Sequence, residues 1–506
     1  MQIRHRATLA LGAALLAVVF AVHGPVLAFP YVQEDWEILG VVAHQPFTFA
    51  VAHAFRAVHA IHYRPLVATW LIALNQIVGT NGLCSHVLVL LLLAGASLSL
   101  ALLVERLTGD RVLAALVAVS HAAANVIHID TLMIQTCGVE NLGGTLCFFL
   151  GAWLFLKQRP ILSASLYAVG LLVKETTIVL PAFVLWCALL VGDEGASPFA
   201  RARAMLPRMW PHALVLAGYL SIKLRGLSPF TAQPSDPYYM SFFGKHLVTN
   251  GMTYLRWSLD ALMPSAPPLA AAAIAFVVGA AALAVGRGPN ARLRQPRFVL
   301  FLLGWFAIGI GPMVVMPNHT YRYYLEFAIP AIWIAWWIAL RVIAGRVLGS
   351  ERRVTLAAAA GVLALCAAAA IDLRQRVAAR AELDGSNETL TRATTVARVK
   401  SLLERDCGKV PQGGTLLFDD VEVWAFGQEA GPRLWCDNPR MSAFDARHLR
   451  VSKSGELAMV DSPTHQGELY TGAHNYAALE AASTFVVHRR DDQLALDPVA
   501  RWLEER

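Results

Sequence analysis

The sequence predicts a polytopic α-helical membrane protein with about eleven transmembrane helices, followed by a small C-terminal α/β domain. Of the 506 residues, 56% are hydrophobic and 15% are charged, and the mean hydropathy is +0.50. A soluble protein carries roughly 25% charged residues. The apolar residues gather in blocks of about 17 to 23 residues, the length that a helix needs to cross a hydrocarbon core of ~30 Å.

The first apolar block extends from about Ala7 to Ala28. Because it is longer than the apolar region of a signal peptide, we interpret it as an uncleaved first span. Arg64–Thr80 is interrupted by Asn75 and Gln76, which predicts a helix lying on the membrane surface. Together with the later spans, these segments define a transmembrane domain over residues 1–371 with an outer loop at 29–82. The later spans are expected at residues 83–105, 111–128, 139–157, 160–173, 175–192, 210–225, 267–286, 297–315, 322–341 and 354–371.

The loops between these blocks alternate between rich and poor in Lys and Arg. In membrane proteins the loops on the cytoplasmic side carry the excess of Lys and Arg. The rich set comprises Arg4, Arg6, Arg106, Arg111, Lys157, Arg159, Arg201, Arg203, Arg208, Arg287, Arg292, Arg294, Arg297, Arg341, Arg346, Arg352 and Arg353. We therefore expect the N-terminus in the cytoplasm and loop 29–82, Lys174 and Arg322 on the outer side. The net charge of +7 follows from these loops and does not indicate a nucleic-acid partner.

The composition changes after Asp372 and predicts a soluble extracytoplasmic α/β domain over residues 372–506. Residues 374–405 read as a helix, and strands are expected at Thr415–Phe418, Val421–Trp424 and Thr484–His488. In an oxidising compartment Cys407 and Cys436 are a candidate disulfide, with two free thiols as the alternative. The other five cysteines read as small core residues.

An acidic cluster follows the first span, at Glu34, Asp35 and Glu37 around Trp36. On spacing alone, the favoured interpretation is a solvated first turn of a helix, where acidic side chains are stabilised. The alternative is a general base or a metal ligand at the mouth of a membrane cavity.

Basic residues at the expected outer face suit an anionic substrate. Lys174 and Glu175 stand between two apolar blocks, and ionisable residues at membrane depth usually mark a site. Arg322 and Arg64 suit phosphate oxygens, which arginine binds in a bidentate way. His62, His319 and Tyr321 lie beside these arginines and are pocket candidates, although a lone histidine is more often structural. No Walker loop, Rossmann turn or GxSxG motif is present, so nucleotide-driven chemistry is not expected.

The order of several short motifs resembles the integral-membrane glycosyltransferases of the GT-C superfamily, in particular their protein O-mannosyltransferase-like branch. The resemblance covers about residues 5–345. The motifs are Glu34-Asp35-Trp36, Tyr63-Arg64-Pro65-Leu66, Ser85-His86, Glu105-Arg106-Leu107-Thr108-Gly109, Glu140-Asn141-Leu142, Lys174-Glu175, Val179-Leu180-Pro181 and Tyr321-Arg322-Tyr323-Tyr324.

This resemblance implies an inverting transfer of a sugar from a polyprenyl-phosphate donor to a protein or glycan acceptor, at the outer face of a bacterial inner membrane. Asp35 or Glu34 would be the base. Lys174, Arg322 and Arg64 would hold the donor phosphate. Glu175, Trp36, Tyr321, His62 and His319 would line the pocket for the acceptor. A divalent metal, Mg²⁺ or Mn²⁺, is left open, with Glu34, Asp35 and Glu140 as its candidate ligands, and Asn141 stands where related sequences often have an acid.

Two other classes of function compete with this one. A transporter or flippase of lipid-linked cargo would show repeated halves and broken helices near the middle of the membrane, and no internal repeat is visible. A catalytically silent relative would act as a membrane scaffold through its C-terminal domain.

Overall fold

The computed structural model describes residues 2–42, 46–56, 63–191, 197–226, 234, 239–262, 296–379, 389–452, 456–459, 478–490 and 493–505. The chain divides into two compact units. The helical unit comprises Met1–Leu27, His86–Leu132 and Cys137–Ala379, and the mixed unit comprises Ala28–Ser85, Met133–Thr136 and Arg380–Arg506. The outer loop and the C-terminal domain expected from the sequence therefore belong to one unit, and the helical unit extends to Ala379.

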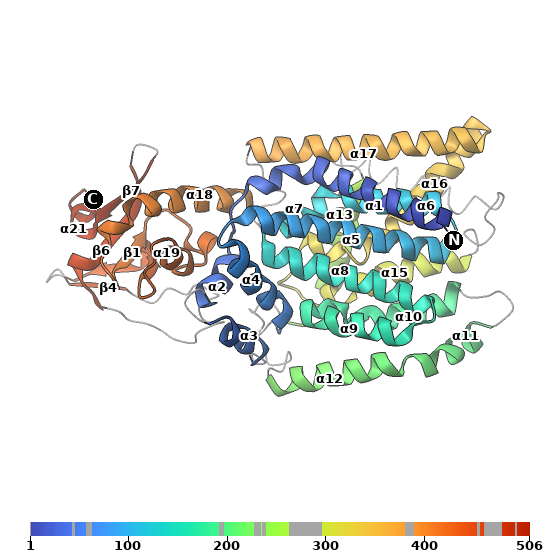
Figure 1. Cartoon of the computed structure of the whole chain (residues 1–506), viewed down its shortest axis with the longest axis horizontal. Coiled ribbons are helices and arrows are strands. Elements are labelled where there is room, and N and C mark those ends of the chain that lie inside the picture. The colour runs from blue at the N-terminus through green and yellow to red at the C-terminus, as the bar shows by residue number, and fades with distance from the viewer. Residues whose placement is uncertain are drawn as a thin grey trace. The chain divides into compact units, whose positions relative to one another are not determined.

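The helical unit consists of helices and short 3-10 turns, drawn in Figure 1. Its helix α6 packs against α1, α16 and α17, and α15 packs against α10 and α16. In chain order the helices are α1 (Gln2–His23), α5 (Gly82–Thr108), α6 (Arg111–Ala123), α7 (Asn125–Met133), α8 (Gln135–Leu156), α9 (Pro160–Val173), α10 (Leu180–Val191), α11 (Pro198–Met205), α12 (Trp210–Gly226), α13 (His246–Leu262), α15 (Pro296–Val314), α16 (Ile329–Leu348) and α17 (Glu351–Ala379). The 3-10 turns are η1 (Gly24–Ala28), η2 (Glu175–Val179), η3 (Leu206–Arg208) and η5 (Arg322–Leu325).

Six helices in the described part of the chain are long and apolar enough to cross a membrane, or seven if the bent pair α6 and α7 is one span. The pair bends by 51° at Ala124. These helices agree with the spans expected at 83–105, 111–128, 139–157, 297–315 and 354–371, and with the first span. The protein therefore has the hydrophobic helices of a membrane protein, but the count of eleven spans is wrong for the described residues.

The difference comes mainly from short helices. Helix α9 has 14 residues and α10 has 12, so at 1.5 Å per residue they are about 20 Å long, less than a hydrocarbon core of ~30 Å. Helix α12 has 17 residues and also contains Lys223. The expected span at 322–341 starts late, because Arg322–Leu325 is a 3-10 turn and the helix begins at Ile329. The span expected at 267–286 lies outside the described residues.

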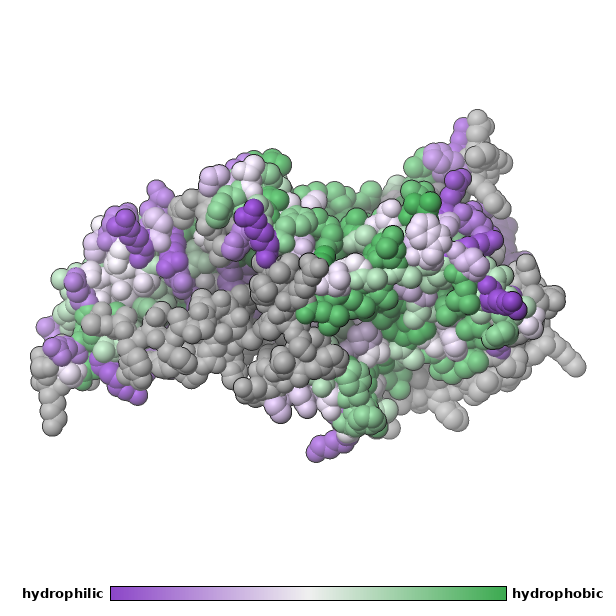
Figure 2. Space-filling model, turned by 90° about the horizontal axis from the view of Figure 1, so that it is seen from below, coloured by the Kyte–Doolittle hydropathy of each residue, from purple (hydrophilic) through white to green (hydrophobic). Residues whose placement is uncertain are grey.

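The surface of the helical unit carries many large apolar side chains. Leu214, Leu224, Leu303 and Leu363 are each more than 60% exposed. Figure 2 shows hydrophobic residues gathered over this unit on the face that it draws. A water-soluble protein rarely leaves so much apolar surface uncovered, whereas a lipid-facing surface requires it.

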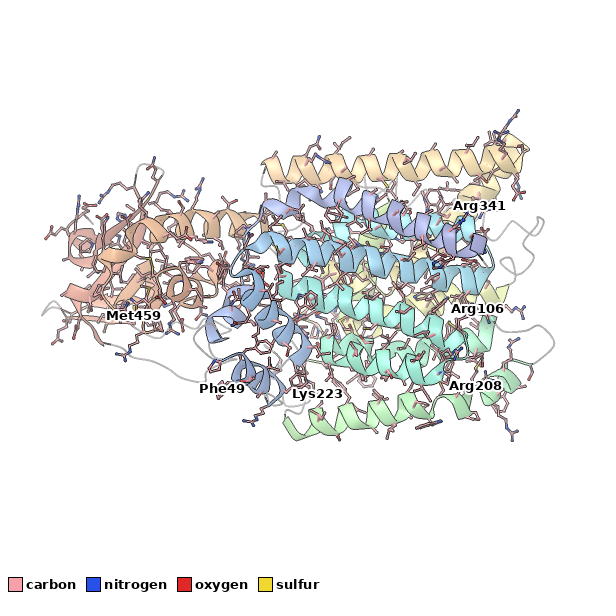
Figure 3. All side chains as sticks on the ribbon, viewed as in Figure 1. Phe49, Arg106, Arg208, Lys223, Arg341 and Met459 are labelled. Carbon is pink, nitrogen blue, oxygen red and sulfur yellow. A yellow bond between two sulfur atoms is a disulfide. The ribbon has the colours of Figure 1, made fainter. Side chains whose placement is uncertain are left out.

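Arginines gather at one end of the helical unit. Figure 3 shows Arg106, Arg208 and Arg341 at the same end of the bundle and Lys223 at the opposite end. The end with the arginines holds an ion pair, Arg341 to Asp110 at 2.6 Å. The three arginines belong to the set that the loop charges assigned to one side of the membrane, so their grouping agrees with that assignment.

The core of the helical unit is aromatic. Trp305, Trp333, Phe148 and Phe183 are fully buried, and the Trp305 indole donates to the carbonyl oxygen of Phe327 at 2.8 Å. Gly309 allows this packing, because a Cβ atom there would lie 2.8 Å from the backbone of Ala328. Helix α15 therefore approaches the start of α16 closely.

The mixed unit joins short helices to two small sheets. Strands β2, β1 and β6 run parallel and β7 is antiparallel to β6, in the order β2-β1-β6-β7, while β3-β4-β5 form an antiparallel sheet. Its helices are α2 (Glu34–Val42), α3 (Phe47–Arg56), α4 (Pro65–Val78), α18 (Thr389–Asp406), α19 (Ala430–Trp435) and α21 (Val499–Glu504). Its strands are β1 (Thr415–Phe418), β2 (Ser442–Asp445), β3 (Leu449–Val451), β4 (Leu457–Met459), β5 (Ala478–Leu479), β6 (Thr484–Arg490) and β7 (Gln493–Pro498).

Two of the three expected strands are confirmed, as β1 and β6. Their apolar residues Leu417 and Val486 are paired in register and lie in a buried cluster with Val499 and Trp502. The strand expected at Val421–Trp424 is wrong. The chain turns at Asp420, whose φ is +55°, and continues as the 3-10 turn η7 (Val423–Phe426).

Of the two alternatives for Cys407 and Cys436, the structure has the disulfide, with its Cα atoms 5.3 Å apart. It joins the end of α18 to the end of α19 across 29 residues. A crosslink of this kind stabilises a protein mainly by restricting its unfolded chain.

Replacement of both cysteines by serine is expected to lower the stability of the mixed unit by about 3.5 kcal/mol, from the length of the closed loop. Thermal unfolding of the full chain measures the change. Cys84→Ser, at a half-buried free cysteine of the same unit, is the matched control and leaves the transition in place. Labelling of both Cys407 and Cys436 in the unreduced wild-type protein would contradict the crosslink.

Candidate functional site

The centre of the candidate site is a buried ion pair in the helical unit. Lys174 ends α9 and Glu140 lies on α8; their side chains are 3% and 5% exposed, and Nζ lies 3.0 Å from Oε2. The Lys174 ammonium also lies 5.7 Å and 5.5 Å from the ring centroids of Tyr323 and Tyr324. A Cβ on Gly144 would lie 3.0 Å from the Lys174 Cβ, so the absence of a side chain there lets the lysine pack against α8.

Lys174 occupies the negative end of a helix. It is the C-cap of α9, and its backbone N–H donates to the Gly170 carbonyl at 2.7 Å. A cation is stabilised there by the unpaired carbonyl groups of the last turn. Glu140 and the helix end together explain how this charge is held away from water.

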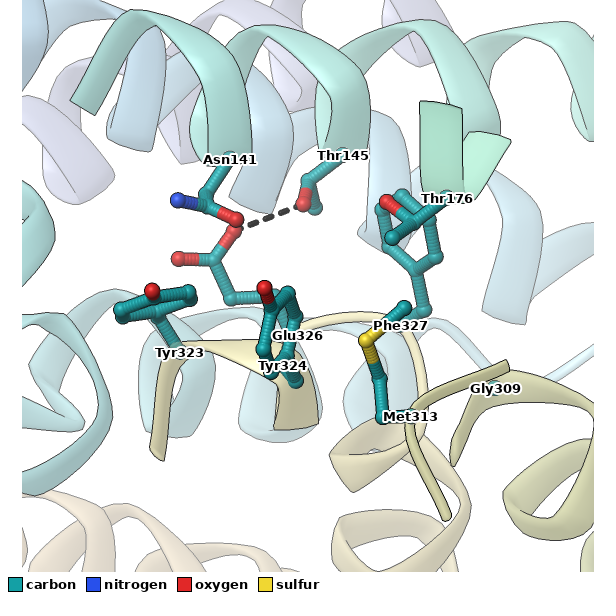
Figure 4. A pocket seen from close by; sticks show the side chains of 9 residues that line it. All are labelled: Asn141, Thr145, Thr176, Gly309, Met313, Tyr323, Tyr324, Glu326 and Phe327. Atoms are coloured by element: carbon teal, nitrogen blue, oxygen red, sulfur yellow. Dashed lines mark hydrogen bonds between the residues drawn. The ribbon is translucent and has the colours of Figure 1, made fainter. Parts of the chain in front are cut away.

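A small cavity lies beside this pair in the same unit. Figure 4 shows the carboxyl group of Glu326 pointing towards Asn141 and Thr145. The Thr145 hydroxyl donates to Glu326 Oε2 at 2.7 Å. The lining residues are Asn141, Thr145, Thr176, Gly309, Met313, Tyr323, Tyr324, Glu326 and Phe327. The cavity volume is about 10 Å³, the room that one water molecule needs.

Arg322 has a different set of neighbours from Lys174. Its guanidinium lies 3.4 Å from Asp260 of α13 and 5.0 Å from the ring centroid of Trp257. The Arg322 side chain is 11% exposed. The charge expected to hold a phosphate is thus already compensated by an acid and by an aromatic face.

The aromatic residues around Arg322 form one cluster. His319 and Tyr321 have ring centroids 4.7 Å apart, and Tyr321 stacks on Tyr323 at 5.2 Å. Tyr323 in turn contacts Tyr324 at 4.7 Å. The structure therefore brings Tyr321 and His319 into the same aromatic cluster as the two rings that contact Lys174.

Asp35 lies in the mixed unit as a buried carboxylate with four hydrogen bonds. Oδ2 accepts from the backbone N–H groups of Val32 at 3.3 Å and Gln135 at 3.0 Å. Oδ1 accepts from the backbone N–H and the hydroxyl of Thr136, both at 2.7 Å. The N–H groups of Gln135 and Thr136 are the first of α8, so the carboxylate stabilises a helix start. Burial raises the pKa of Asp35 to about 6, while the hydrogen bonds from Thr136, Gln135 and Val32 oppose the rise.

Trp36 and Glu37 belong to the same buried turn. Trp36 is fully buried, donates to the Tyr31 carbonyl at 2.6 Å and contacts Trp435 edge-on. Burial, followed by the neighbouring charges of Glu34 and Glu429, raises the pKa of Glu37 to about 8. The interpretation of this segment as a solvated turn is therefore wrong for Asp35 and Trp36, which are both inaccessible.

The remaining candidates are distributed as follows. Glu175 opens η2 directly after Lys174, and Arg64 is the N-cap of α4 in the mixed unit. Glu34 is half-buried at the start of α2. His62 lies outside the described residues.

No cluster of three or more His, Cys, Asp or Glu side chains that could hold a metal ion occurs within the described ranges. Of the candidate ligands, Asp35 is bonded to backbone donors and Glu140 to Lys174. These residues therefore do not fit a metal site.

Sequence reasoning missed Glu326 and the histidines His121 and His128, which are all buried in the helical unit. The sequence did contain a clue to them, because all three residues fall inside stretches that were predicted to span the membrane. An ionisable residue inside a span is costly and usually has a function.

Comparison with known protein families and with curated proteins finds no match to this chain.

Asp35→Asn is expected to lower the stability of the folded chain by about 3 kcal/mol, because either orientation of the amide turns its NH₂ towards two donors. Thermal unfolding of the purified chain measures this. Glu34→Gln, one residue earlier and half-buried, is the matched control and should change stability by less than about 0.5 kcal/mol. Equal stabilities for the two variants would show that the hydrogen bonds of Asp35 do not stabilise the fold.

Glu37→Gln is expected to stabilise the chain at neutral and alkaline pH. Because the folded pKa of Glu37 is raised from 4.5 to about 8, its ionisation destabilises the folded state as pH rises through this window. The gain from the variant should therefore be absent below pH 4.5 and reach roughly 2 kcal/mol above pH 8, discounted for partial exposure. Unfolding curves across this range test it, with the exposed Glu404→Gln as control; a gain that does not depend on pH would contradict the assignment.

Proposed function

We propose that the protein transfers a sugar from a polyprenyl-phosphate donor to a protein or glycan acceptor, with inversion at the sugar C1. The observation that carries the proposal is the buried cation Lys174, held between Glu140 and two tyrosine rings beside a cavity. It stands in the motif that resembles the lipid-phosphate-dependent glycosyltransferases.

A lipid-linked donor explains why a buried cation is useful. The donor already carries its leaving group, a phosphate, so the enzyme has to position the acceptor and stabilise the charge that develops as the C1–O bond breaks. A desolvated ammonium stabilises that charge strongly, because the surrounding dielectric is low. Lys174 and Arg322 are proposed to take this role, each by exchanging its carboxylate partner for phosphate oxygens.

The base is proposed among the carboxylates, with Asp35 and Glu34 as the first-loop candidates. A pKa near 6 suits Asp35 for accepting a proton close to neutral pH. Its four hydrogen bonds favour a structural role instead, in which the carboxylate holds the start of α8 in place. Sugar transfer per folded molecule separates the roles. If Asp35 is the base, Asp35→Asn loses transfer even in the molecules that fold, whereas a structural role alone predicts lower stability with transfer kept in those molecules.

The proposal also includes an orientation. The end of the helical unit with Arg106, Arg208 and Arg341 is proposed to face the cytoplasm of a bacterial cell, following the positive-inside rule. The disulfide Cys407–Cys436 supports an oxidising compartment for the mixed unit.

A proton-coupled transporter of lipid-linked cargo is the second candidate. It is favoured by buried ionisable side chains within the helical unit, among them Glu326 and His128, and by the breaks at Ala124 and Lys174. Movement of a labelled lipid across a vesicle membrane, without any glycosylated product, would favour this candidate over sugar transfer.

Lys174 is tested with its partner, because removing one charge alone leaves the other buried and unpaired. The double variant Lys174→Met with Glu140→Gln is expected to fold normally. It should raise the KM for the lipid donor by about 10- to 100-fold, because one or two hydrogen bonds from a charged group to the donor phosphate are lost. Radiolabelled sugar transfer in membranes measures it. Arg106→Gln, at the other end of the unit, should leave the donor KM unchanged; an unchanged KM in the double variant would refute the phosphate role.

A further inference from the structure

Three buried histidines gather in the helical unit, and the proposed sugar transfer uses none of them. His121 on α6 and His128 on α7 have ring centroids 5.0 Å apart, and His23 at the end of α1 lies 6.3 Å from His128. All three are completely buried. Each has one ring nitrogen without a hydrogen-bond partner, which is costly in a protein interior unless a proton or a ligand occupies it.

The hydrogen bonds fix the tautomer of His128. Its Nε2 lies 2.8 Å from the backbone oxygen of His121. A carbonyl oxygen only accepts, so Nε2 carries the hydrogen and donates it. In the neutral ring, Nδ1 is therefore a bare lone pair.

This lone pair faces a second acceptor. Glu326 Oε1 lies 3.4 Å from His128 Nδ1, and neither atom has a hydrogen-bond partner. The other carboxyl oxygen of Glu326 accepts from Thr145. A carboxylate and an imidazole lone pair repel each other at this distance, and one proton between them turns the repulsion into a charge-assisted hydrogen bond.

We propose that His128 and Glu326 form a proton-binding site, which holds one shared proton between Nδ1 and Oε1 and exchanges it with the adjacent cavity. The proton resides on either group, as a carboxylic acid facing imidazole or as a carboxylate facing imidazolium. The stoichiometry is one proton in both cases. No other bond forms or breaks.

The neighbouring groups support exchange through the cavity. Glu326 lines a space with room for about one water molecule, so a water there would contact its carboxyl group. The titratable groups around the pair are His121 and His23 on the side of His128, and Tyr323 and Tyr324 on the side of Glu326. The ammonium of Lys174 lies against these two tyrosines and is compensated by Glu140.

The site has a consequence that rests on the proposed function. An anionic lipid phosphate bound near Lys174 would be repelled by an ionised Glu326 if His128 is neutral. Binding of the donor is therefore coupled to uptake of the shared proton. Two unit charges about 10 Å apart, in an effective dielectric of about 20, change a binding constant roughly tenfold.

The proton is tested on the full chain in lipid nanodiscs by infrared spectroscopy during a pH titration. Loss of the shared proton should change a carboxyl band and an imidazole band at one midpoint. Glu326→Gln should remove both changes, and it should fold, because its NH₂ group can donate to His128 Nδ1. His128→Asn should shift the midpoint of the carboxyl band.

His212→Asn is the matched control. His212 is also fully buried in the helical unit and bonds to Ser163 at 2.9 Å, so its loss should leave both bands unchanged. The proposal is overturned if Glu326→Gln keeps both changes, or if His128→Asn leaves the carboxyl midpoint where it is in the wild type.

The coupling is tested by the binding of a polyprenyl phosphate without sugar to the same preparations. The wild type should bind it about tenfold more weakly at alkaline than at acidic pH, and Glu326→Gln should bind it equally at both. Equal pH dependence in the two proteins would overturn the coupling. A complete lack of binding would overturn the phosphate site of the proposed function, while the infrared titration would still decide the shared proton.

Discussion

The cost of burying charge in an apolar helical unit governs the arrangement of its ionisable residues. A charged side chain in such surroundings is stable only beside a compensating group. Lys174 is paired with Glu140, Arg322 with Asp260, and Arg341 with Asp110. Each pair joins two helices or turns that are distant in sequence. The pairs therefore link distant parts of the chain, and an anionic ligand at Lys174 or Arg322 has to compete with a carboxylate that is already in place.

Short and broken helices determine where these charges lie. Lys174 follows the last residue of a 14-residue helix, so the chain places a cation where helical carbonyl groups have no intrahelical partner. Asp35 is the counterpart in the mixed unit, because it lies at the first N–H groups of α8. A continuous span would satisfy its own backbone and would offer neither position.

The sequence was sufficient for the features that depend on local composition. The long apolar blocks, β1 and β6 were predicted, and the pairing of Cys407 with Cys436 was one of two alternatives that the sequence left open. The number of spans was not predicted, because short apolar blocks such as 160–173 were counted as spans and because hydropathy cannot show that the chain turns at Arg322–Leu325. The partners of Lys174 could not be predicted either, because Glu140 is 34 residues away in the sequence and its contact with Lys174 depends on the fold. Glu326 was missed although it stood inside an expected span, where its charge was a usable signal.

The unused bonding capacity of a buried group indicates whether it serves structure or chemistry. Asp35 accepts four hydrogen bonds, so any reaction at its oxygens must first break a helix start. His128 Nδ1 and Glu326 Oε1 lie 3.4 Å apart, and neither has a hydrogen-bond partner, so this contact is favourable only when a proton lies between the two atoms. A fold that needed the pair only for packing would be more stable with apolar side chains of similar size. The proposed shared proton therefore explains why His128 Nδ1 and Glu326 Oε1, two hydrogen-bond acceptors, lie opposite each other beside a water-sized cavity.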